Sequence, residues 1–109
     1  MPQLSVRGIE PQSMALVSGR LVEELAAICQ CDTNNFTIDC LQITSVWSGE
    51  LVPTYPFIEV AWFDRGTQVR DQLARAVTRH VQSLGIPELE IAFRVYRENE
   101  YYINGLPCV

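Results

Sequence analysis

The chain has 109 residues, which fits the commonest size of a single domain, and 48% of them are hydrophobic. Its formal net charge is −5 and all eight basic residues are arginine, a balance poorly suited to binding nucleic-acid phosphates. We therefore expect one folded domain over residues 1–109 and no nucleic-acid partner.

The sequence also indicates the cellular compartment and the cofactors to be expected. No apolar run is long enough to span a membrane, and no secretion signal precedes the first predicted strand. We therefore expect a cytoplasmic protein without a membrane partner, in which the four cysteines are thiols. The Cys29-Gln30-Cys31 spacing is not that of a zinc site, and there is no glycine-rich phosphate loop, so we expect no metal and no other cofactor.

The first half of the chain predicts a strand, a helix and a second strand. Residues 3–7 alternate between polar and apolar side chains, which is typical of a short strand. A helix is expected to begin at Glu10-Pro11, because proline is tolerated in the first turn, and to end near residues 31–35. Residues 36–46 are rich in Ile, Thr and Val and predict the second strand, with a bulge where the alternation shifts at Cys40-Leu41.

The second half repeats this order after a proline-containing loop over residues 48–56. A third strand, a second helix and a fourth strand are predicted over residues 57–63, 67–84 and 89–95. The tail ENEYYINGLPCV contains Asn-Gly, a strong signal for a tight hairpin turn.

The resulting order is βαββαβ, an α+β (α/β) class in which one βαβ unit is used twice. We place the first unit at about residues 1–48, the second at about 55–98 and a C-terminal tail at 99–109. Two architectures share this order. In a ferredoxin-like sheet each crossover skips a strand position, whereas in the other each unit pairs its own two strands in parallel.

The start "MP", followed at once by a strand within a doubled βαβ chain of this length, resembles the tautomerase superfamily. That superfamily includes macrophage migration inhibitory factor and 4-oxalocrotonate tautomerase. The segments MPQLSVRGIE, NNFTID, IEVAWFDR and YYINGL are most similar to a bacterial branch known only as a domain of unknown function. The resemblance implies a duplicated βαβ tautomerase-like fold, a four-stranded mixed sheet with two helices on one face. It also implies a homotrimer with three sites at the subunit boundaries.

The resemblance gives Pro2 a chemical role. Removal of Met1 would leave Pro2 with a secondary amine at the chain end. An apolar pocket near an arginine disfavours the protonated amine, so the amine can take a proton from carbon beside a carbonyl at neutral pH. If Met1 is retained, the nitrogen is an amide and cannot act as a base.

Topology indicates which residues surround Pro2. Parallel pairing within the first unit brings the start of the second strand, with Asn35, beside Pro2. An antiparallel third strand brings the segment WFDRG there, with Phe63 and Arg65. This segment resembles the stretch of 4-oxalocrotonate tautomerase that carries a substrate-binding arginine, so Arg65 is expected to hold a substrate carboxylate bidentately. The alternative is an Arg65 that pairs with Asp64 or is solvated.

The chain also departs from the family. No lysine is available to match the pocket lysine of migration inhibitory factor, and the position of a second family arginine falls near Asp39. The carbonyl-polarising donor must come from elsewhere, and a neighbouring subunit could offer Arg94, Arg97, Tyr101 or Tyr102. The predicted site is Pro2 and Arg65 as catalytic residues with Asn35, Phe63, Arg97 and Tyr101 as substrate-binding residues.

Two further residues have competing interpretations. Glu59 is the only charge in FIEVAWF, and we expect it to pair with an arginine such as Arg94 or Arg7 rather than act as a second acid or base. His80 lies within the apolar stripe of the second helix, and we expect a hydrogen-bonded core residue rather than a catalytic one.

Three hypotheses follow for function. The first is a tautomerase-like isomerase that moves a proton on a small keto or enol carboxylic acid, with Pro2 as general base. The second is a non-catalytic trimer of the same fold that binds a small acid or a protein partner. The third is a ferredoxin-like regulatory or binding domain.

Overall fold

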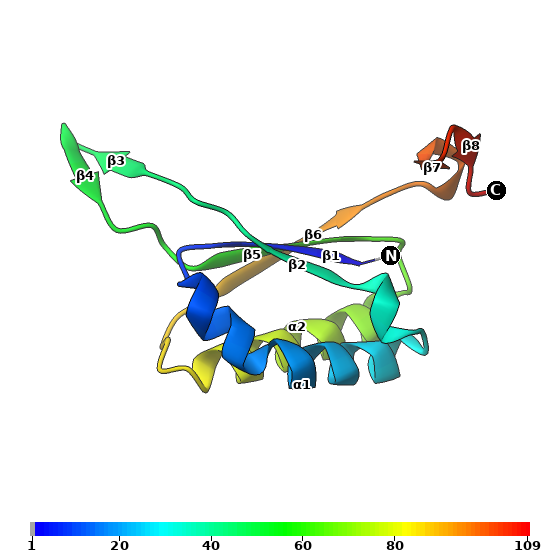
Figure 1. Ribbon diagram of the computed structural model, residues 1–109, viewed down its shortest axis with the longest axis horizontal. Helices are drawn as coiled ribbons and strands as arrows, with labels where there is room; N and C mark the ends of the chain where they lie inside the picture. The colour runs from blue at the N-terminus through cyan, green and yellow to red at the C-terminus, as the bar shows by residue number, and fades with distance from the viewer. Residues whose placement is uncertain (1) are drawn as a thin grey trace.

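The computed structural model describes residues 2–109, which form two layers, a four-stranded mixed sheet and two helices. The helices α1 (Pro11–Cys29) and α2 (Thr67–Gln82) cover one face of the sheet, and the opposite face, here called the uncovered face, has no helix on it (Figure 1). The strands of this sheet are β1 (Gln3–Arg7), β2 (Thr37–Cys40), β5 (Phe57–Trp62) and β6 (Glu90–Val95). The predicted fold class is confirmed.

The sheet has the strand order β2-β1-β5-β6. β1 is parallel to β2, β5 is parallel to β6, and the two central strands β1 and β5 are antiparallel. Each βαβ unit therefore pairs its own two strands. The ferredoxin-like alternative is wrong, because its crossovers would place another strand between them.

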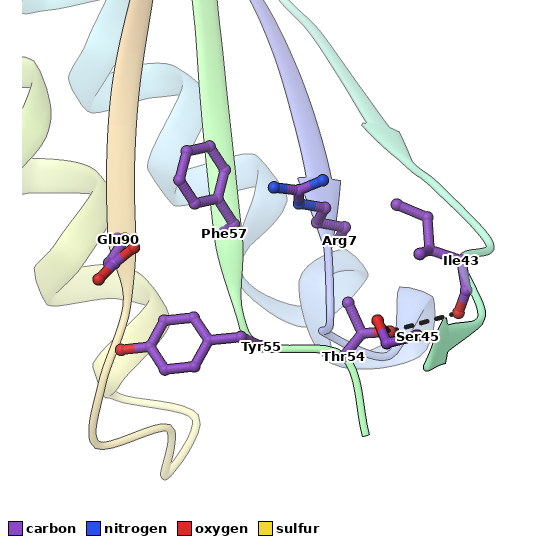
Figure 2. Close-up of a pocket in the computed structure, with 7 residues that line it drawn as sticks. All are labelled: Arg7, Ile43, Ser45, Thr54, Tyr55, Phe57 and Glu90. Carbon is purple, nitrogen blue, oxygen red and sulfur yellow. Dashed lines mark hydrogen bonds between the residues drawn. The ribbon is translucent and has the colours of Figure 1, made fainter. Parts of the chain in front are cut away.

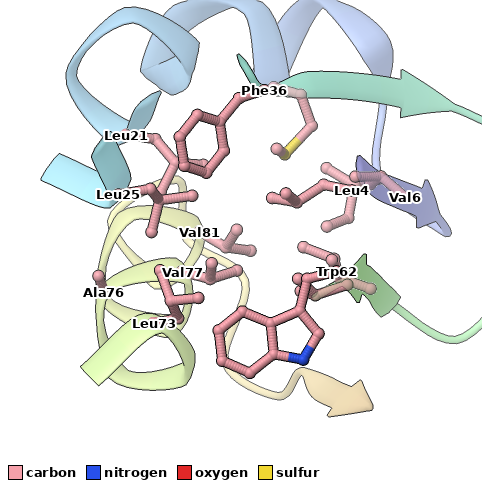
Figure 3. Close-up of a cluster of buried hydrophobic side chains, with 14 of the residues drawn as sticks. Leu4, Val6, Leu21, Leu25, Phe36, Trp62, Leu73, Ala76, Val77 and Val81 are labelled. Atoms are coloured by element: carbon pink, nitrogen blue, oxygen red, sulfur yellow. The ribbon is translucent and has the colours of Figure 1, made fainter. Parts of the chain in front are cut away.

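The alternation of β1 determines which side chains reach the core. Leu4 and Val6 are buried against the helices, whereas Gln3, Ser5 and Arg7 lie on the uncovered face. Leucine and valine side chains from both helices meet these strand residues, and Trp62 lies at the edge of the same cluster (Figure 3). The core therefore lies between the sheet and the helices. This is the place where a strand with alternating side chains and two helices with one apolar face each can bury their apolar residues.

Gly8 ends β1 at a position that requires glycine. Its φ is +79°, and a Cβ there would lie 2.6 Å from the carbonyl oxygens of both Thr54 and Tyr55. A left-handed backbone and this close approach both exclude a side chain. Gly8 thus fixes the segment that precedes β5 against the end of β1.

The strand predicted over residues 36–46 is divided in two. After the short helix η1 (Thr33–Asn35), β2 ends at Cys40, and the chain leaves the sheet beyond a last hydrogen bond from Leu41 N to Val6 O (2.7 Å). The bulge expected at Cys40-Leu41 is therefore wrong, because β2 ends there.

The chain then forms a hairpin of β3 (Ser45–Trp47) and β4 (Glu50–Val52), called the hairpin arm below. It projects from one end of the sheet (Figure 1). Ser48 and Gly49 both have positive φ, 50° and 78°, which is the geometry of a tight hairpin turn. The first part of the predicted loop 48–56 is thus a turn and a strand.

The C-terminal segment forms a second hairpin at the other end of the sheet (Figure 1). The helix η2 (Glu98–Glu100) leads into β7 (Tyr102–Ile103) and β8 (Leu106–Pro107). Asn104 and Gly105 have φ values of 51° and 82°. The predicted Asn-Gly turn is confirmed.

Candidate functional site

Pro2 lies at the start of the central strand β1, where three strands meet. Its carbonyl oxygen accepts a hydrogen bond from Thr37 N (3.3 Å), and its side chain is fully buried. Gln3 pairs with Thr37 of β2 and with Ala61 of β5, so Pro2 stands between Phe36 on one side and Trp62 on the other. The expected placement of the second-strand start and the third-strand end beside Pro2 is confirmed.

Arg65 lies at this same end of the sheet. Its guanidinium donates to the carbonyl oxygen of Phe63 (2.9 Å) and lies 5.7 Å from the centre of the Trp62 ring. Trp62 is therefore the neighbour that Pro2 and Arg65 share. An indole face attracts a guanidinium, which holds Arg65 at this end while most of its five N–H donors stay available.

Asp64 forms no ion pair with Arg65 among the described residues. Its carboxylate accepts a hydrogen bond from Gly66 N (2.8 Å) at the start of α2, and no Asp64–Arg65 ion pair exists within 4.0 Å in the described chain. The ion-paired alternative for Arg65 is thus wrong. The short loop 63–66 positions an arginine beside Trp62 and keeps its acidic neighbour turned to the helix.

Cys29, at the C-terminal end of α1, packs against the core close enough to Arg65 for the arginine charge to act on its thiol. Burial raises the pKa of the Cys29 thiol, and the nearby positive charge of Arg65 acts in the opposite direction. Trp62 contributes an indole N–H that is buried without a hydrogen-bond partner among residues 2–109. The Pro2 end thus combines apolar walls, one cation and one unused donor.

A cluster of aromatic side chains stands on the uncovered face beside Pro2. The rings of Phe63 and Tyr101 are 5.1 Å apart in an edge-to-face arrangement, and those of Tyr96 and Tyr101 are 5.4 Å apart. Gln3 Nε2 donates to the Tyr101 hydroxyl at 3.5 Å. Tyr101 was expected to reach a site from a neighbouring subunit, yet it already lies beside Gln3 of its own chain. The structure therefore brings Phe63 and Tyr101 together at the Pro2 end.

The remaining two predicted site residues differ in position. Asn35 is half-buried at the end of η1, two residues before Thr37, and so lies near the Pro2 end. Arg97 is exposed and its guanidinium lies 3.7 Å from the Glu100 carboxylate. In the single chain its one ion-pair partner among the described residues is therefore Glu100.

Glu59 and His80 both have side-chain partners in the structure. Glu59 and Arg94 form an ion pair across the sheet (3.2 Å), as predicted. His80 is hydrogen-bonded, as predicted, but its partner is Glu24 of α1 (2.9 Å) at the seam between the helices. The hydrogen bond from Arg79 and then that from His80 hold the pKa of Glu24 below its ordinary value.

Sequence reasoning missed a hollow at the opposite end of β1. It has a volume of about 450 Å³ and is called the Arg7 hollow (Figure 2). Its lining residues are Arg7, Ile43, Ser45, Thr54, Tyr55, Phe57 and Glu90. From the sequence, Arg7 was predicted only as a possible partner of Glu59. The hollow was missed because no local sequence motif indicates how neighbouring strands are aligned.

In residues 2–109 no helix is both long and apolar enough to cross a membrane. Over the same residues, no group of three or more His, Cys, Asp or Glu side chains is arranged to hold a metal ion.

Comparison with solved structures gives close matches over almost the whole chain. A DUF1904 protein from Sebaldella termitidis ATCC 33386 is 32% identical, with a TM-score of 0.90 over 98% of this chain and 99% of that one. A protein of unknown function from Vibrio cholerae O1 biovar eltor str. N16961 is 27% identical, with a TM-score of 0.86 over 97% and 86% of the two chains. Native fused 4-OT is 13% identical, with a TM-score of 0.77 over 97% and 95%, which establishes a common fold.

A comparison with curated proteins found no match. The family comparison, in contrast, matches residues 1–107 to a domain of unknown function, DUF1904. This extent and the likeness to the Sebaldella protein agree with the strand order and helix placement described above. The chain belongs to the DUF1904 family, and its fold is that of the tautomerase superfamily.

Proposed function

We propose that this protein is a tautomerase-like isomerase that moves a proton on a small keto or enol carboxylic acid. The observation that carries the proposal is the position of Pro2, buried at the start of the central strand and beside residue Trp62 of β5, whose ring lies 5.7 Å from the Arg65 guanidinium. The fold is shared with fused 4-OT and with a member of the cis-3-chloroacrylic acid dehalogenase family. The proposal requires that Met1, which lies outside the described residues, is removed.

Pro2 would act as the general base through its free secondary amine. The walls around it are largely apolar, and an amine in such surroundings has a lowered pKa because burial disfavours its cationic form. The amine takes a proton from the carbon beside the substrate carbonyl, so that an N–H bond forms, a C–H bond breaks and an enolate remains. Return of that proton to another atom of the enolate completes the isomerisation and restores the amine.

Arg65 would hold the substrate carboxylate. Its hydrogen bond to Phe63 O engages one N–H group, and a planar guanidinium has further donors for a bidentate contact. Trp62 Nε1 is buried without a partner in the described chain, so a substrate oxygen could use this donor only if the neighbouring side chains moved to admit it. Phe63 and Tyr101 would form the aromatic side of the site, and Asn35 is a further polar group near its β2 side.

We also propose a homotrimer. Fused 4-OT structures are described as symmetric and asymmetric trimers. In this chain both hairpins carry apolar side chains that a single subunit leaves exposed, among them Trp47 at 76%, Leu51 at 77% and Leu106 at 70%. Exposed apolar groups gathered on two projecting elements favour contact with further copies.

The test begins with the mature N-terminus. Intact mass should give a chain that lacks Met1, and light scattering should give the mass of a trimer. Ketonisation of phenylenolpyruvate should then follow saturation kinetics. Pro2→Ala should lower kcat by about 10²–10⁴-fold, the usual contribution of a general base. Unchanged turnover in Pro2→Ala would contradict the proposed mechanism.

A covalent probe gives an independent measure of the same amine. The structural neighbour Pt0534 was crystallised after inactivation by 2-oxo-3-pentynoate. We expect this 2-oxo acid to add across its triple bond to the Pro2 nitrogen, which increases the mass by that of the whole reagent. The peptide that contains Pro2 should carry the label, and Arg65→Gln should slow labelling because the carboxylate is held less tightly.

A second candidate is a non-catalytic trimer that binds a small acid or a protein partner. It is favoured by the Arg97–Glu100 ion pair, which engages a predicted substrate-binding residue. Retention of Met1, with saturable binding of enol acids and no turnover, would select this function over the first.

A further inference from the structure

The Arg7 hollow lies at the far end of β1 from Pro2. Arg7 lies five residue positions along the extended chain from Pro2, which corresponds to about 17 Å along a strand. No residue of the predicted catalytic site lines this hollow. It is therefore a separate place in the fold, and the inference drawn from it stands apart from the proposed function.

Three side chains cross the floor of the hollow in one row. Arg7 of β1 pairs in register with Phe57 of β5, and Phe57 pairs with Glu90 of β6. Residues paired in this way point to the same face of a sheet, here the uncovered face, and neighbouring strands lie about 4.8 Å apart. A cation, an aromatic ring and an anion thus stand side by side in that order (Figure 2).

The positive end of the row is available to a ligand. The Arg7 guanidinium lies 4.8 Å from the centre of the Phe57 ring, and no carboxylate of residues 2–109 comes within 4.0 Å of it. Arg94, on the same face, is instead paired with Glu59. Stacking on a ring orients a guanidinium while its in-plane N–H groups remain free for a carboxylate.

The negative end is built on the opposite side of Phe57. Glu90 forms no ion pair within the described chain, and Tyr55 donates its hydroxyl hydrogen to Glu88 (3.0 Å). The hydrogen bond to Glu88 raises the pKa of Tyr55, and the charges of Glu88 and Glu90 act in the same direction. This side of the hollow therefore has a negative potential that favours a cation.

The wall on the Arg7 side is fixed by the root of the hairpin arm. The hydroxyls of Ser45 and Thr54 lie 2.8 Å apart, and Thr54 donates to the carbonyl oxygen of Ile43 (3.3 Å). This pair joins the two chains of the arm where they leave the sheet. These hydrogen bonds form without a ligand, and a wall that is already ordered lowers the cost of binding one.

We propose that the Arg7 hollow binds a small amino acid in its zwitterionic form. Arg7 holds the carboxylate, the carbon chain lies on the Phe57 ring, and Glu90 holds the ammonium group. A simple acid would leave Glu90 without a partner, and a simple amine would leave Arg7 without one. The class that satisfies both ends is therefore a molecule with both charges separated by a short apolar chain.

Calorimetric titration with a series of amino acids tests the proposal on the purified full chain in its own assembly state. The series is glycine, β-alanine, 4-aminobutyrate, 5-aminopentanoate and 6-aminohexanoate, with butyrate and butylamine as singly charged probes. We expect saturable binding with an optimum chain length. The best member should bind at least about tenfold more tightly than either singly charged probe, because one charged contact is worth roughly one decade of affinity.

Substitutions assign the two ends. Arg7→Gln should weaken binding of amino acids and of butyrate, and Glu90→Gln should weaken binding of amino acids while leaving that of butyrate unchanged. Arg20→Gln, on the exposed surface of α1, is the matched control and should change neither. Arg7→Lys keeps the charge and covers the case in which Arg7→Gln does not fold, with an intermediate affinity expected from the loss of the planar fork.

Three results would overturn the proposal. They are the absence of saturable binding across the series, equal affinity for amino acids and both singly charged probes, and loss of binding in Arg65→Gln with retention in Arg7→Gln. The last result would place the ligand at the Pro2 end. It would leave the proposed isomerase untouched, just as loss of turnover in Pro2→Ala would leave amino-acid binding at Arg7 untouched.

Discussion

The two ends of β1 present opposite environments on one short strand. At the Pro2 end the neighbours are Trp62, Phe36 and an aromatic cluster, and the side chain of Pro2 is fully buried. At the other end Arg7 and Glu90 are exposed, and a single aromatic ring separates them. An apolar end suits an uncharged base, whereas an open charged end suits recognition of a charged ligand.

The two arginines give the largest expected contrast. Arg65→Gln should raise KM for an enol acid by about 10–100-fold, because it removes a charge-assisted contact to the carboxylate. Steady-state kinetics with phenylenolpyruvate measure this, with Arg20→Gln as the control for loss of any surface arginine. An unchanged KM in Arg65→Gln would remove Arg65 from the site and with it the chemical distinction between the two ends.

β5 begins with Phe57 and ends with Trp62, and substitution of each residue should change the stability of the fold by a different amount. Trp62 is 0% exposed and lies in the core, whereas Phe57 is only half-buried on the uncovered face. Trp62→Leu should lower the free energy of unfolding by about 2–4 kcal/mol through lost burial and a cavity, and Phe57→Leu by about 1 kcal/mol. Urea unfolding of both variants measures the difference, and equal losses would contradict the assignment of Trp62 to the core and of Phe57 to the uncovered face.

Gly8 tests whether the Arg7 end can be disturbed by itself. Gly8→Ala introduces a Cβ 2.6 Å from two carbonyl oxygens at a φ of +79°, so the segment at Thr54 and Tyr55 must shift. We expect a loss of about 1–3 kcal/mol in the free energy of unfolding, the range for strained positive φ positions. Hydrogen exchange should increase first in the amides near residues 54–57, whereas an increase centred on Pro2 would show that the ends are mechanically coupled.

The smallest expected effect lies on the helices that support both ends. The folded-state pKa of Glu24 is lowered, chiefly by the hydrogen bond from Arg79 and then by that from His80, so Glu24 stabilises the fold above its ordinary pKa of 4.5. This stabilisation is lost as pH falls through the lowered value. Glu24→Gln should therefore reduce the free energy of unfolding by up to about 1 kcal/mol at neutral pH, because the site is partly exposed.

Urea unfolding of the native chain and Glu24→Gln at several pH values measures this dependence. The two proteins should converge in stability as the pH approaches the lowered pKa from above. A difference that grows on acidification would contradict the direction assigned to the Glu24 shift.

Local patterns predicted most of the fold, because the elements follow from periodicity. The alternation of β1 and the apolar stripes of both helices are local signals, and Asn104-Gly105 correctly indicated a tight turn. The hairpin arm was missed because the apolar and β-branched run after Phe36 continues past Cys40, where the main sheet ends. Its turn also has serine at a positive φ, a weaker signal than asparagine.

The sequence predicted those parts of the site whose positions follow from the order and direction of the strands. Parallel and antiparallel pairing sufficed to bring the segment before Thr37 and the segment after Trp62 to Pro2. The row of Arg7, Phe57 and Glu90 depends on register across three strands, and a shift of one residue would turn any of these side chains to the other face. Tyr101 was assigned to another subunit because the return of the tail to Gln3 has no local signature.

The two tryptophans differ in exposure and can serve as intrinsic fluorescence probes of two different regions. Trp62 is sealed in the core beside Arg65, and Trp47 stands at 76% exposure near the tip of the hairpin arm. In a single subunit a water-soluble collisional quencher such as iodide would reach the indole of Trp47 and not that of Trp62, and contact of the arm with another copy would shield Trp47. Emission from Trp47 therefore reports contacts made by the arm, and emission from Trp62 reports the packing of the core.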